Sequence, residues 1–362
     1  MNHSITNKKV LLAPLDWGLG HATRCIAIIR MLQILGCDVT IAASGTIKSL
    51  LQNEFPNLSF LELPGYKIAY SKSKRILPFK ILIQVPKILK IIRFENRWLN
   101  NLLKGNKFDA VISDNRFGLY AKDVTTVFIT HQLLIKTGFS WLDLVLQRIN
   151  YSFINRYKEC WVPDFEDDLN IAGKLSHPKS LPKINLKYLG LLSRFSKQES
   201  KPFKYKWMAI ISGPEPQRSI FEKKIFELAS ASKESFLIVR GLPGKPEKDF
   251  ALPNCKVFNH LKTADMQEAI EASEFIISRC GYTTVMEILS LQKKSVFIPT
   301  PGQTEQEYLA KHLLQQSWSY TFNQNEDFMQ QIENAKSFAY SLPEFDAQLY
   351  KSVLTTFVNQ LH

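Results

Sequence analysis

A glycine-rich turn near the start of the chain holds a histidine and an arginine. It comprises Gly18, Gly20, His21 and Arg24, and it follows a short apolar run, Lys8–Pro14, that predicts a buried strand. Glycines at such a junction let backbone N–H groups approach a ligand, and the first turn of the next helix favours an anion. A histidine at the carboxyl end of a strand can take up a proton near neutral pH. The turn therefore predicts a site for acid–base chemistry, with a helix cap at His21 as the structural alternative.

Polar residues end two later strands of the same half. The runs at 110–113 and 126–130 predict strands; the first leads into Asp114 and Asn115, and the second leads into His131. Because the carboxyl ends of parallel strands lie at one edge of a sheet, these side chains should face the same cleft as the histidine of the glycine turn. The alternative for Asp114 and Asn115 is a turn-capping role, which is common for Asp and Asn.

A second glycine turn lies in the C-terminal half. The segment SRCGYTTVMEIL starts at Ser278, and KKSVFIPTPGQTEQEYLA follows it from Lys293. Together they resemble the donor-site signature of GT-B glycosyltransferases of family 28, the family that includes the peptidoglycan lipid-II N-acetylglucosaminyltransferases. The segment WGLGHATR at 17–24 is similar to the glycine loop that opens the first domain of the same superfamily, and more similar still to relatives that carry G-x-G-H-x-x-R.

The resemblance covers both halves of the chain in the same order. It implies an α/β fold of GT-B architecture, with two doubly wound Rossmann-like domains facing a cleft. We expect an N-terminal acceptor-binding domain at 1–186 and a C-terminal nucleotide-sugar-binding domain at 187–345, with a final helix at 346–362 that can pack back on the first domain. Alternating strand and helix patterns occur in both halves, and the lysine-rich, aperiodic stretch 183–206 marks the change between them.

The resemblance places a nucleotide-sugar donor on the second glycine turn. Gly281 opens a predicted helix, Thr283–Ser290, whose first N–H groups suit a diphosphate. Glu287, one turn further on, can accept both ribose hydroxyls, and the forked guanidinium of Arg279 can hold a phosphate. Relatives place further donor contacts on the loop after the domain's first strand, on a backbone position and on a later helix. The complete expected set is Ser212, Gly213, Arg218, Leu261, Arg279, Gly281, Tyr282, Thr283, Thr284, Glu287, Gln306 and Glu307.

The resemblance also implies a catalytic pair, since inverting members often pair a histidine after the first strand with a later aspartate. His21 would remove the proton of the acceptor hydroxyl and Asp114 would fix the tautomer of its ring; Asp16 is the rival base. No D-x-D motif occurs, so we expect neither a metal ion nor a cofactor, with a UDP-sugar as co-substrate. The expected acceptor-binding residues are Gly18, Gly20, Arg24, Asn115 and His131.

Charge is divided unevenly along the 362 residues. Residues 1–195 carry 27 Lys and Arg against 14 Asp and Glu, whereas 196–362 carry 19 of each, so the first half holds the net charge of +13. Eight of these basic residues, and no acidic one, fall in Lys67–Arg93. Helical angles over 79–99 sort apolar and basic side chains onto opposite arcs, which suits an anionic lipid surface. The alternative is a helix whose apolar arc packs on the core while its lysines face water.

Cysteine usage and hydropathy predict a location. The five cysteines lack C-x-x-C spacing, which favours a reducing cytoplasm. No uncharged run reaches the ~20 residues of a transmembrane helix. We expect a cytoplasmic protein, peripheral on the inner face of the cytoplasmic membrane through residues 67–97. Aromatic residues do not alternate with the lysines there as in single-strand binders, so no nucleic-acid partner is expected.

These patterns predict an inverting, metal-independent glycosyltransferase. It would move a hexosyl or N-acetylhexosaminyl group from a UDP-sugar to a lipid-linked or otherwise anionic acceptor at the cell envelope. Two alternatives stay open: an isomerase like the UDP-sugar 2-epimerases, which share the architecture, and a non-catalytic lipid- or anion-binding protein of GT-B fold. Turnover of the UDP-sugar without an acceptor would favour the isomerase, and a lack of UDP affinity would favour the binding protein.

Overall fold

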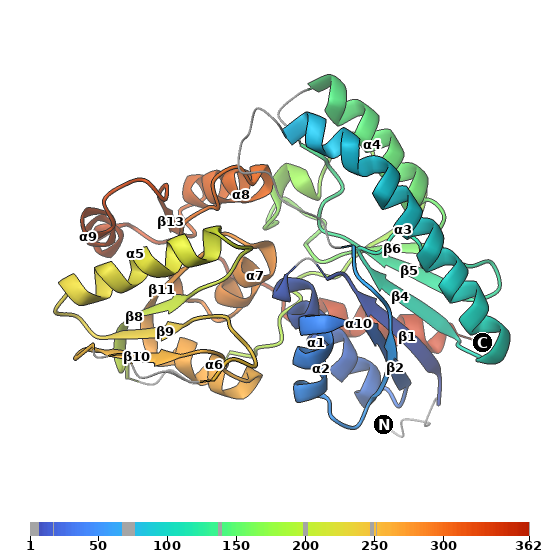
Figure 1. Ribbon diagram of the computed structural model, residues 1–362, viewed down its shortest axis with the longest axis horizontal. Coiled ribbons are helices and arrows are strands. Elements are labelled where there is room, and N and C mark those ends of the chain that lie inside the picture. The colour runs from blue at the N-terminus through green and yellow to red at the C-terminus, as the bar shows by residue number, and fades with distance from the viewer. Residues whose placement is uncertain are drawn as a thin grey trace. The chain divides into compact units, whose positions relative to one another are not determined.

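The chain folds as two compact α/β units, shown in the computed structural model of Figure 1. The structure describes residues 7–16, 18–66, 77–136, 140–197, 202–246, 250 and 252–361, without the side chains of 77–85, 140 and 141. One unit comprises Met1–Leu192 with Asp346–His362, and the other comprises Ser193–Phe345. The first unit extends past the expected boundary at residue 186 because the strand at 185–188 pairs with its sheet.

Within the described ranges, the first unit is built on a seven-stranded sheet in the order β3-β2-β1-β4-β5-β6-β7. Every strand pair in it is parallel. The strands are β1 (Lys9–Pro14), β2 (Asp38–Ala43), β3 (Ser59–Glu62), β4 (Ala110–Asp114), β5 (Thr125–Ile129), β6 (Glu159–Val162) and β7 (Asn185–Tyr188). The helices are α1 (Leu19–Ile34), α2 (Gly45–Glu54), α3 (Leu77–Gly105), α4 (Ser140–Ile154) and α10 (Leu349–Asn359), with a 3-10 turn at Gly173–Leu175.

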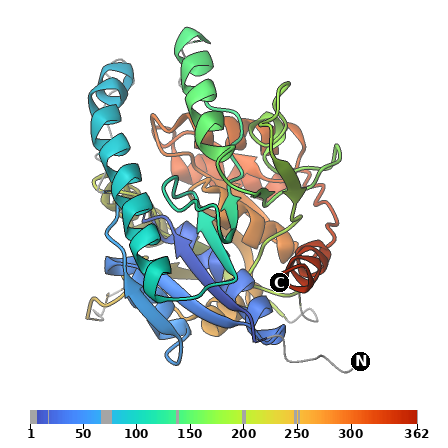
Figure 2. The ribbon, with the colours of Figure 1, turned by 90° about the vertical axis from the view of Figure 1, so that its right-hand side faces the viewer.

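Helices cover both faces of this sheet, which is why its strands are almost uniformly apolar. The pairing register places Ala13, Phe128 and Cys160 on one face. Helices α3 and α4 pack against that face through the apolar clusters around these residues, and Figure 2 shows both on the same side of the sheet. Helices α1, α2 and α10 cover the opposite face, where the ring of Phe357 contacts Trp161 at 4.9 Å between centroids.

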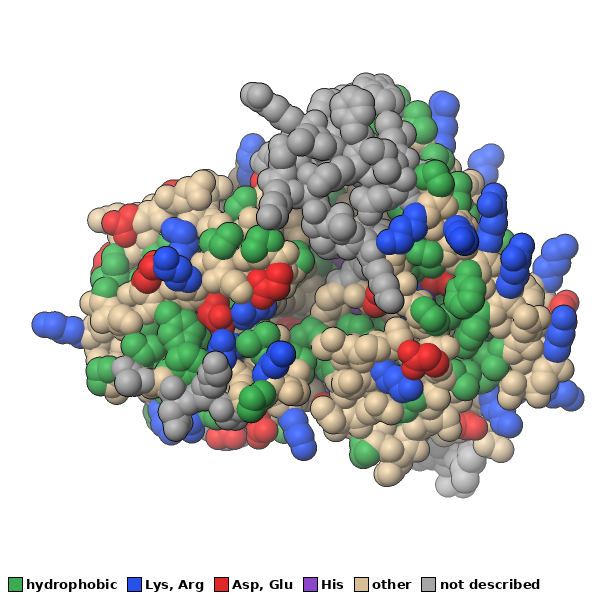
Figure 3. Space-filling view, viewed as in Figure 1, with side chains coloured by type: hydrophobic (Ala, Val, Ile, Leu, Met, Phe, Trp, Pro, Cys, Tyr) green, Lys and Arg blue, Asp and Glu red, His purple; other side chains and the backbone are tan. Residues whose placement is uncertain are grey.

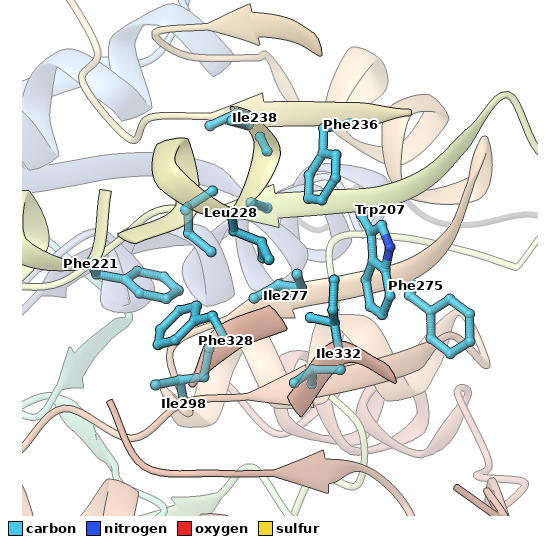
Figure 4. Close-up of a cluster of buried hydrophobic side chains, with 14 of the residues drawn as sticks. Trp207, Phe221, Leu228, Phe236, Ile238, Phe275, Ile277, Ile298, Phe328 and Ile332 are labelled. Atoms are coloured by element: carbon cyan, nitrogen blue, oxygen red, sulfur yellow. The ribbon is translucent and has the colours of Figure 1, made fainter. Parts of the chain in front are cut away.

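The described part of the second unit holds a six-stranded parallel sheet in the order β10-β9-β8-β11-β12-β13. Its strands are β8 (Tyr205–Ile210), β9 (Phe236–Val239), β10 (Cys255–Phe258), β11 (Ser273–Ser278), β12 (Lys294–Phe297) and β13 (Tyr320–Thr321). Its helices are α5 (Gln217–Ala231), α6 (Thr263–Glu271), α7 (Tyr282–Ser290), α8 (Thr304–Gln315) and α9 (Phe328–Ser337). Figure 4 shows its main core, in which α5 and α9 meet one face of the sheet around Trp207, Phe275 and Ile277.

The strand order reverses once in each sheet, and the reversal positions the loops of interest. In the first unit the chain runs outward from β1 to β3 and then returns to β4 on the other side of β1. In the second unit it runs from β8 to β10 and returns to β11 beside β8. Loops that leave the two central strands diverge at such a point and open a crevice at the carboxyl edge, where ligands of this fold type bind. Both glycine turns found in the sequence follow one of these central strands.

The doubly wound α/β architecture predicted in each half is confirmed, and most of the expected strands and helices lie within a few residues of their predicted positions. The sequence reading did not identify α2, α4 or α9. Among the described residues, no helix is both long enough and apolar enough to cross a bilayer.

Candidate active site

A buried polar cluster lies at the strand-order reversal of the first unit. Helix α1 begins directly after Gly18, so His21 lies in its first turn and Arg24 follows one turn later on the same side. Asp114 ends the neighbouring strand β4. The Nδ1 atom of His21 is 3.1 Å from Asp114 Oδ2, and Arg24 Nε donates to the same oxygen at 3.0 Å. The structure therefore brings the two expected catalytic side chains into contact.

The electrostatics of the cluster favour a neutral imidazole beside a carboxylate. Burial lowers the pKa of His21, Asp114 counteracts part of this effect, and the Arg24 cation lowers the pKa further. Burial alone would raise the pKa of Asp114, but the charges of Arg24 and His21 outweigh it and hold that pKa well below the usual range. An unprotonated histidine held by an ionised aspartate is the arrangement of a general base.

Two of the expected acceptor-binding side chains are turned inward. Arg24 is 1% exposed, and its guanidinium contacts Asp114, His21 Nδ1 at 2.9 Å and His131 Nδ1 at 3.2 Å. The donors of Arg24 are thus directed into the cluster, and its contact with an acceptor stays a prediction. His131 is 7% exposed and holds Arg24 from the far side.

The remaining expected acceptor residues are more accessible. Gly18 is exposed with a φ of 88°, and a side chain there would meet no atom within 4 Å. Gly20 and Asn115 are half-buried, and Asn115 adopts the left-handed conformation with a φ of 60°. These three residues stay candidates for contact with an acceptor.

Asp16, the rival base, has a structural partner. Its Oδ1 accepts the backbone N–H of Tyr66 at 3.0 Å. Its carboxylate also packs so closely on Gly65 that a Cβ there would lie 1.7 Å from Asp16 Oδ2. Asp16 thus holds the loop that follows β3, which favours His21 as the base.

A second buried network braces the loops around this cluster, and the sequence reading did not find it. Glu95 on α3 is fully buried and accepts from Arg116 Nε at 2.7 Å and from the Tyr66 hydroxyl at 2.8 Å. Arg116 also donates to the carbonyl of Pro14 at 3.3 Å and to that of Pro64 at 2.5 Å. The pair therefore joins α3 to the ends of β1, β3 and β4. The sequence signal for this network was Glu95 itself, an acidic residue within a helix of mostly apolar and basic residues.

The second glycine turn, in the other unit, is open to a ligand. Helix α7 starts after Gly281, which as the N-cap residue supplies no side-chain cap. A Cβ at Gly281 would meet nothing nearer than Thr284 Oγ1 at 4.0 Å. Gly213, in the loop after the adjacent strand β8, has a φ of 111° and no neighbour within 4 Å of a Cβ. An open turn at the positive end of a helix is suited to an anion.

Glu287 lies one turn into α7 and is held by an arginine that the sequence reading missed. Its Oε1 accepts from Arg194 Nε at 2.7 Å, and both side chains are less than a tenth exposed. Arg194 Nη1 also reaches Thr263 Oγ1 at 3.4 Å. Burial raises the pKa of Glu287, and the charge of Arg194 offsets part of that rise. The sequence signal for Arg194 was that it is a single basic residue directly after the stretch GLLS at 190–193.

Arg279 is engaged by groups of its own unit. It is 1% exposed, and its terminal nitrogens donate to the carbonyls of Ile298, Pro299 and Gln217 at 3.0–3.4 Å and to the side chain of Gln324. Burial lowers the pKa of Arg279 to about 10, so it stays charged at neutral pH. The side chain ties the loop before α7 to the ends of β12 and α5, and its direct contact with a phosphate stays a prediction.

Arg218 is likewise engaged within the protein. It pairs with Glu215 at 2.7 Å and with Glu222 at 3.1 Å, and it is 8% exposed. These acids raise the pKa of Arg218 against the effect of its burial. Both acids lie within one turn of Arg218 and fix its side chain along α5, and its predicted contact with the donor stays a prediction.

The other expected donor residues divide into buried and accessible ones. Gln306 and Glu307 hold the preceding turn, accepting from the backbone N–H of Thr300 at 2.9 Å and of Gly302 at 3.0 Å. Their predicted contact with a sugar stays a prediction. The side chains of Tyr282 and Thr283 are buried, whereas those of Ser212, Leu261 and Thr284 are half-buried at the carboxyl edge of the second sheet.

Comparison with known proteins agrees with the order of these sites along the chain. Residues 222–348 match the model of the glycosyltransferase family 28 C-terminal domain. Over 334 residues the chain is 25% identical to an uncharacterized glycosyltransferase of Methanosarcina acetivorans, covering 83% of this chain and 81% of that protein. Over 324 residues it is 24% identical to one of Methanosarcina mazei, with the same coverage of 83% and 81%.

Solved structures share the fold over almost the whole length. The spinosyn rhamnosyltransferase SpnG is similar with a TM-score of 0.62 at 11% identity, covering 98% of this chain and 96% of that one. MurG of Acinetobacter baumannii is similar with a TM-score of 0.52 at 17% identity, covering 98% and 94%. The two parallel-sheet units thus form the GT-B architecture that the motifs implied. With the family match in the second unit, the chain is a glycosyltransferase of the GT-B fold that carries a family 28 C-terminal domain.

Proposed function

We propose that the protein is an inverting, metal-independent glycosyltransferase that moves a sugar from a UDP-sugar to a lipid-linked or otherwise membrane-associated acceptor. The observation that carries the proposal is the pair of His21 and Asp114, with a neutral imidazole 3.1 Å from a buried, ionised carboxylate. It lies at the strand-order reversal of the first unit, and the open helix terminus at Gly281 lies at that of the second.

The donor would bind to the second unit through backbone groups and one carboxylate. The diphosphate accepts hydrogen bonds from the turn at Gly281, where the positive end of α7 favours negative charge. Glu287, held by Arg194, accepts the two ribose hydroxyls. The same helix end stabilises the UDP that departs, so that the protein's own dipoles supply the leaving-group stabilisation.

The acceptor would react in a single displacement. His21 takes the proton of the acceptor hydroxyl at Nε2 while Nδ1–H is directed to Asp114, which stabilises the imidazolium that forms. The acceptor oxygen bonds to the anomeric carbon as the bond from that carbon to the diphosphate oxygen breaks. Attack opposite the leaving group inverts the configuration, and UDP carries away the electron pair.

A membrane-associated acceptor is supported by the surface of α3 and α4. Helix α4 exposes Leu144, Val145 and Ile149 together with Arg148, and helix α3 exposes lysines and arginines on its outer side. Figure 3 shows Lys and Arg side chains gathered over α3, with hydrophobic groups between them. Basic residues near an anionic bilayer contribute ~1 kcal/mol each, and exposed apolar side chains add to this. Of the predicted basic segment, residues 67–76 and the side chains of 77–85 lie outside the described residues.

Two measurements test the proposal together. Thermal shift with UDP, GDP and TDP should show stabilisation by UDP, and His21→Ala should keep that shift. Mass spectrometry with the UDP-sugar and a lipid extract, in the presence of EDTA, should show product with the wild type and none with His21→Ala. Conversion of the UDP-sugar without any acceptor would instead identify an isomerase. The absence of any nucleotide-dependent shift would contradict the donor assignment.

A further inference from the structure

Arg24 occupies the centre of the catalytic cluster of the first unit. Its Nε and Nη2 donate to the two carboxylate oxygens of Asp114, so the guanidinium fork is matched to the carboxylate. The same Nη2 lies 2.9 Å from Nδ1 of His21, and Nη1 donates to Nδ1 of His131 at 3.2 Å. Arg24 is 1% exposed and Asp114 is fully buried. One cation and the imidazole of His21 thus share a single carboxylate in a site without bulk water.

The charges around His21 oppose one another. The carboxylate of Asp114 stabilises a protonated imidazole, whereas the guanidinium of Arg24 destabilises it as a like charge. A guanidinium can only donate hydrogen bonds, so Nδ1 of His131 accepts and a neutral His131 ring carries its proton on Nε2. Nδ1 of His21 is within reach of both Arg24 Nη2 and Asp114 Oδ2, and the proposed base requires the tautomer in which Nδ1–H donates to Asp114 and Nε2 accepts the proton. His131 also lowers the pKa of His21, and the Cys25 thiol lies 3.6 Å from Asp114 Oδ2.

We propose that Arg24 is a positioning residue that keeps His21 unprotonated before reaction by sharing the carboxylate of Asp114. The inference rests on the proposed role of His21 as the base. Without the cation of Arg24, chiefly burial would oppose the effect of Asp114 on the imidazole, so the pKa of His21 would be higher and less of the resting histidine could accept a proton from an acceptor hydroxyl. The fork of Arg24 also fixes the plane of the carboxylate, which leaves Oδ2 directed at Nδ1 of His21. Once the acceptor proton has reached His21, the nearby cation favours its release and resets the base.

The direct test is the pKa of His21 in the ligand-free full chain, measured by NMR with ¹³C-labelled histidine. His21→Gln assigns the signal. Arg24→Met, which removes the charge at similar length, should raise the pKa of His21 by about 1 pH unit or more. Arg24→Lys, which keeps the charge and loses the fork, should stay much closer to the wild type. Arg30→Met, a half-exposed arginine of the same helix paired with Glu54, serves as the control and should leave the titration unchanged.

The pH profile of transfer gives the second readout. In Arg24→Met the acidic limb of kcat/KM should move upward by the same interval as the NMR titration, with UDP affinity unaltered. An unchanged His21 titration in Arg24→Met, or a rate lowered equally at every pH, would overturn the proposal. If Arg24→Met does not fold, the double variant Arg24→Met/Asp114→Asn is compared with Asp114→Asn, and its His21 pKa should be the higher of the two because only the cation differs. A shifted titration in a protein that shows no transfer under any condition would reject the proposed function while leaving the role of Arg24 intact.

Discussion

At both candidate sites a buried carboxylate is paired with an arginine of its own unit. Asp114 meets the fork of Arg24, and Glu287 meets Arg194 at 2.7 Å. Removing a carboxylate from water costs several kcal/mol, which an arginine in hydrogen-bonding contact offsets in part. Each carboxylate therefore stays available as an anion for chemistry or recognition in a buried position.

The affinity for UDP should fall as the solution is acidified. Burial, only partly offset by Arg194, holds the pKa of Glu287 above its ordinary value. As the pH falls through this raised pKa, the carboxylate gains a proton and loses its capacity to accept both ribose hydroxyls. Calorimetry between pH 8 and pH 5 should show this weakening in the wild type. Glu287→Gln should bind weakly at every pH, and an equal pH dependence in that variant would exclude Glu287 as the titrating group.

Removing the charge of Arg194 should shift the pH at which UDP affinity is lost. In Arg194→Met, burial acts on Glu287 without its partner, so the pKa of Glu287 rises further and the loss of UDP affinity begins at a higher pH. Arg194→Lys restores a cation and should recover most of the wild-type profile. A uniform loss of affinity with an unmoved midpoint would indicate that Arg194 acts only through the fold.

Replacing Gly281 by alanine should weaken ligand binding without changing the stability of the protein. The φ of −79° suits any residue, and the nearest atom to a new Cβ lies 4.0 Å away. Gly281→Ala should keep the wild-type melting temperature and weaken UDP binding by about tenfold, or ~1.4 kcal/mol. Gly105→Ala, also with open space around the new carbon, is the matched control. Unchanged UDP affinity in Gly281→Ala would place the diphosphate elsewhere.

At the scale of elements, one buried ion pair determines where several loops lie. Glu95 on α3 and Arg116 after β4 meet at 2.7 Å, and Arg116 reaches the carbonyls that end β1 and follow β3. The loop that starts at β1 leads directly to the glycine turn of α1. Helix α3 therefore contributes to the position of the catalytic loop through a polar contact as well as through its apolar face.

Removing one partner of the Glu95–Arg116 pair should lower the free energy of unfolding far more than replacing both partners by apolar residues. Glu95→Met leaves the Arg116 cation buried without its acid, and the free energy of unfolding should drop by about 3–5 kcal/mol. Glu95→Met with Arg116→Met removes both charges and should recover most of that loss. Urea unfolding measures both variants. A double variant as unstable as the single one would show that the hydrogen bonds to the loop carbonyls, and not the charge pair, hold the loops.

The elements and the arginines were not equally predictable. Short apolar runs such as 110–113 and 273–278 are long enough to cross a buried sheet, so most strands could be located from the sequence alone. The resemblance implied the pairing of His21 with Asp114, and the expected position of both residues at the carboxyl edge of one sheet agreed with it. Hydrogen-bond partners are set by three-dimensional packing, however, and the chain gives no local signal that an arginine is turned inward. For that reason Arg24, Arg218 and Arg279 were expected on ligands, and the role of Arg194 went unnoticed.

At the scale of the whole molecule, the first unit is completed by residues that come after the second. Helix α10 packs on the sheet face that also carries α1, and its Phe357 is 2% exposed against Trp161. The core of the first unit therefore depends on a segment separated from the rest of it by the entire second unit.

Truncating that contact should destabilise the first unit specifically. Phe357→Ala leaves a cavity against Trp161 and should lower the free energy of unfolding of that unit by about 3–5 kcal/mol. Phe94→Ala, at a position 47% exposed on α3, should change it by less than about 0.5 kcal/mol. Calorimetry with and without UDP should resolve the effect, because the proposed UDP site lies in the second unit and is the same in both variants. Equal losses in both units would show that they unfold as one.

The place of α10 in the sequence, after the second unit, also determines the order in which the two units can complete their folding during synthesis. Domains generally fold as the ribosome releases them, amino-terminal first, but here residues 346–362 leave the exit tunnel only after 193–345. The nascent first unit must wait with the part of its sheet around Trp161 uncovered by α10, while the second unit already has all of its described strands and helices. A second unit that binds the proposed donor would therefore be able to do so before the first unit is complete.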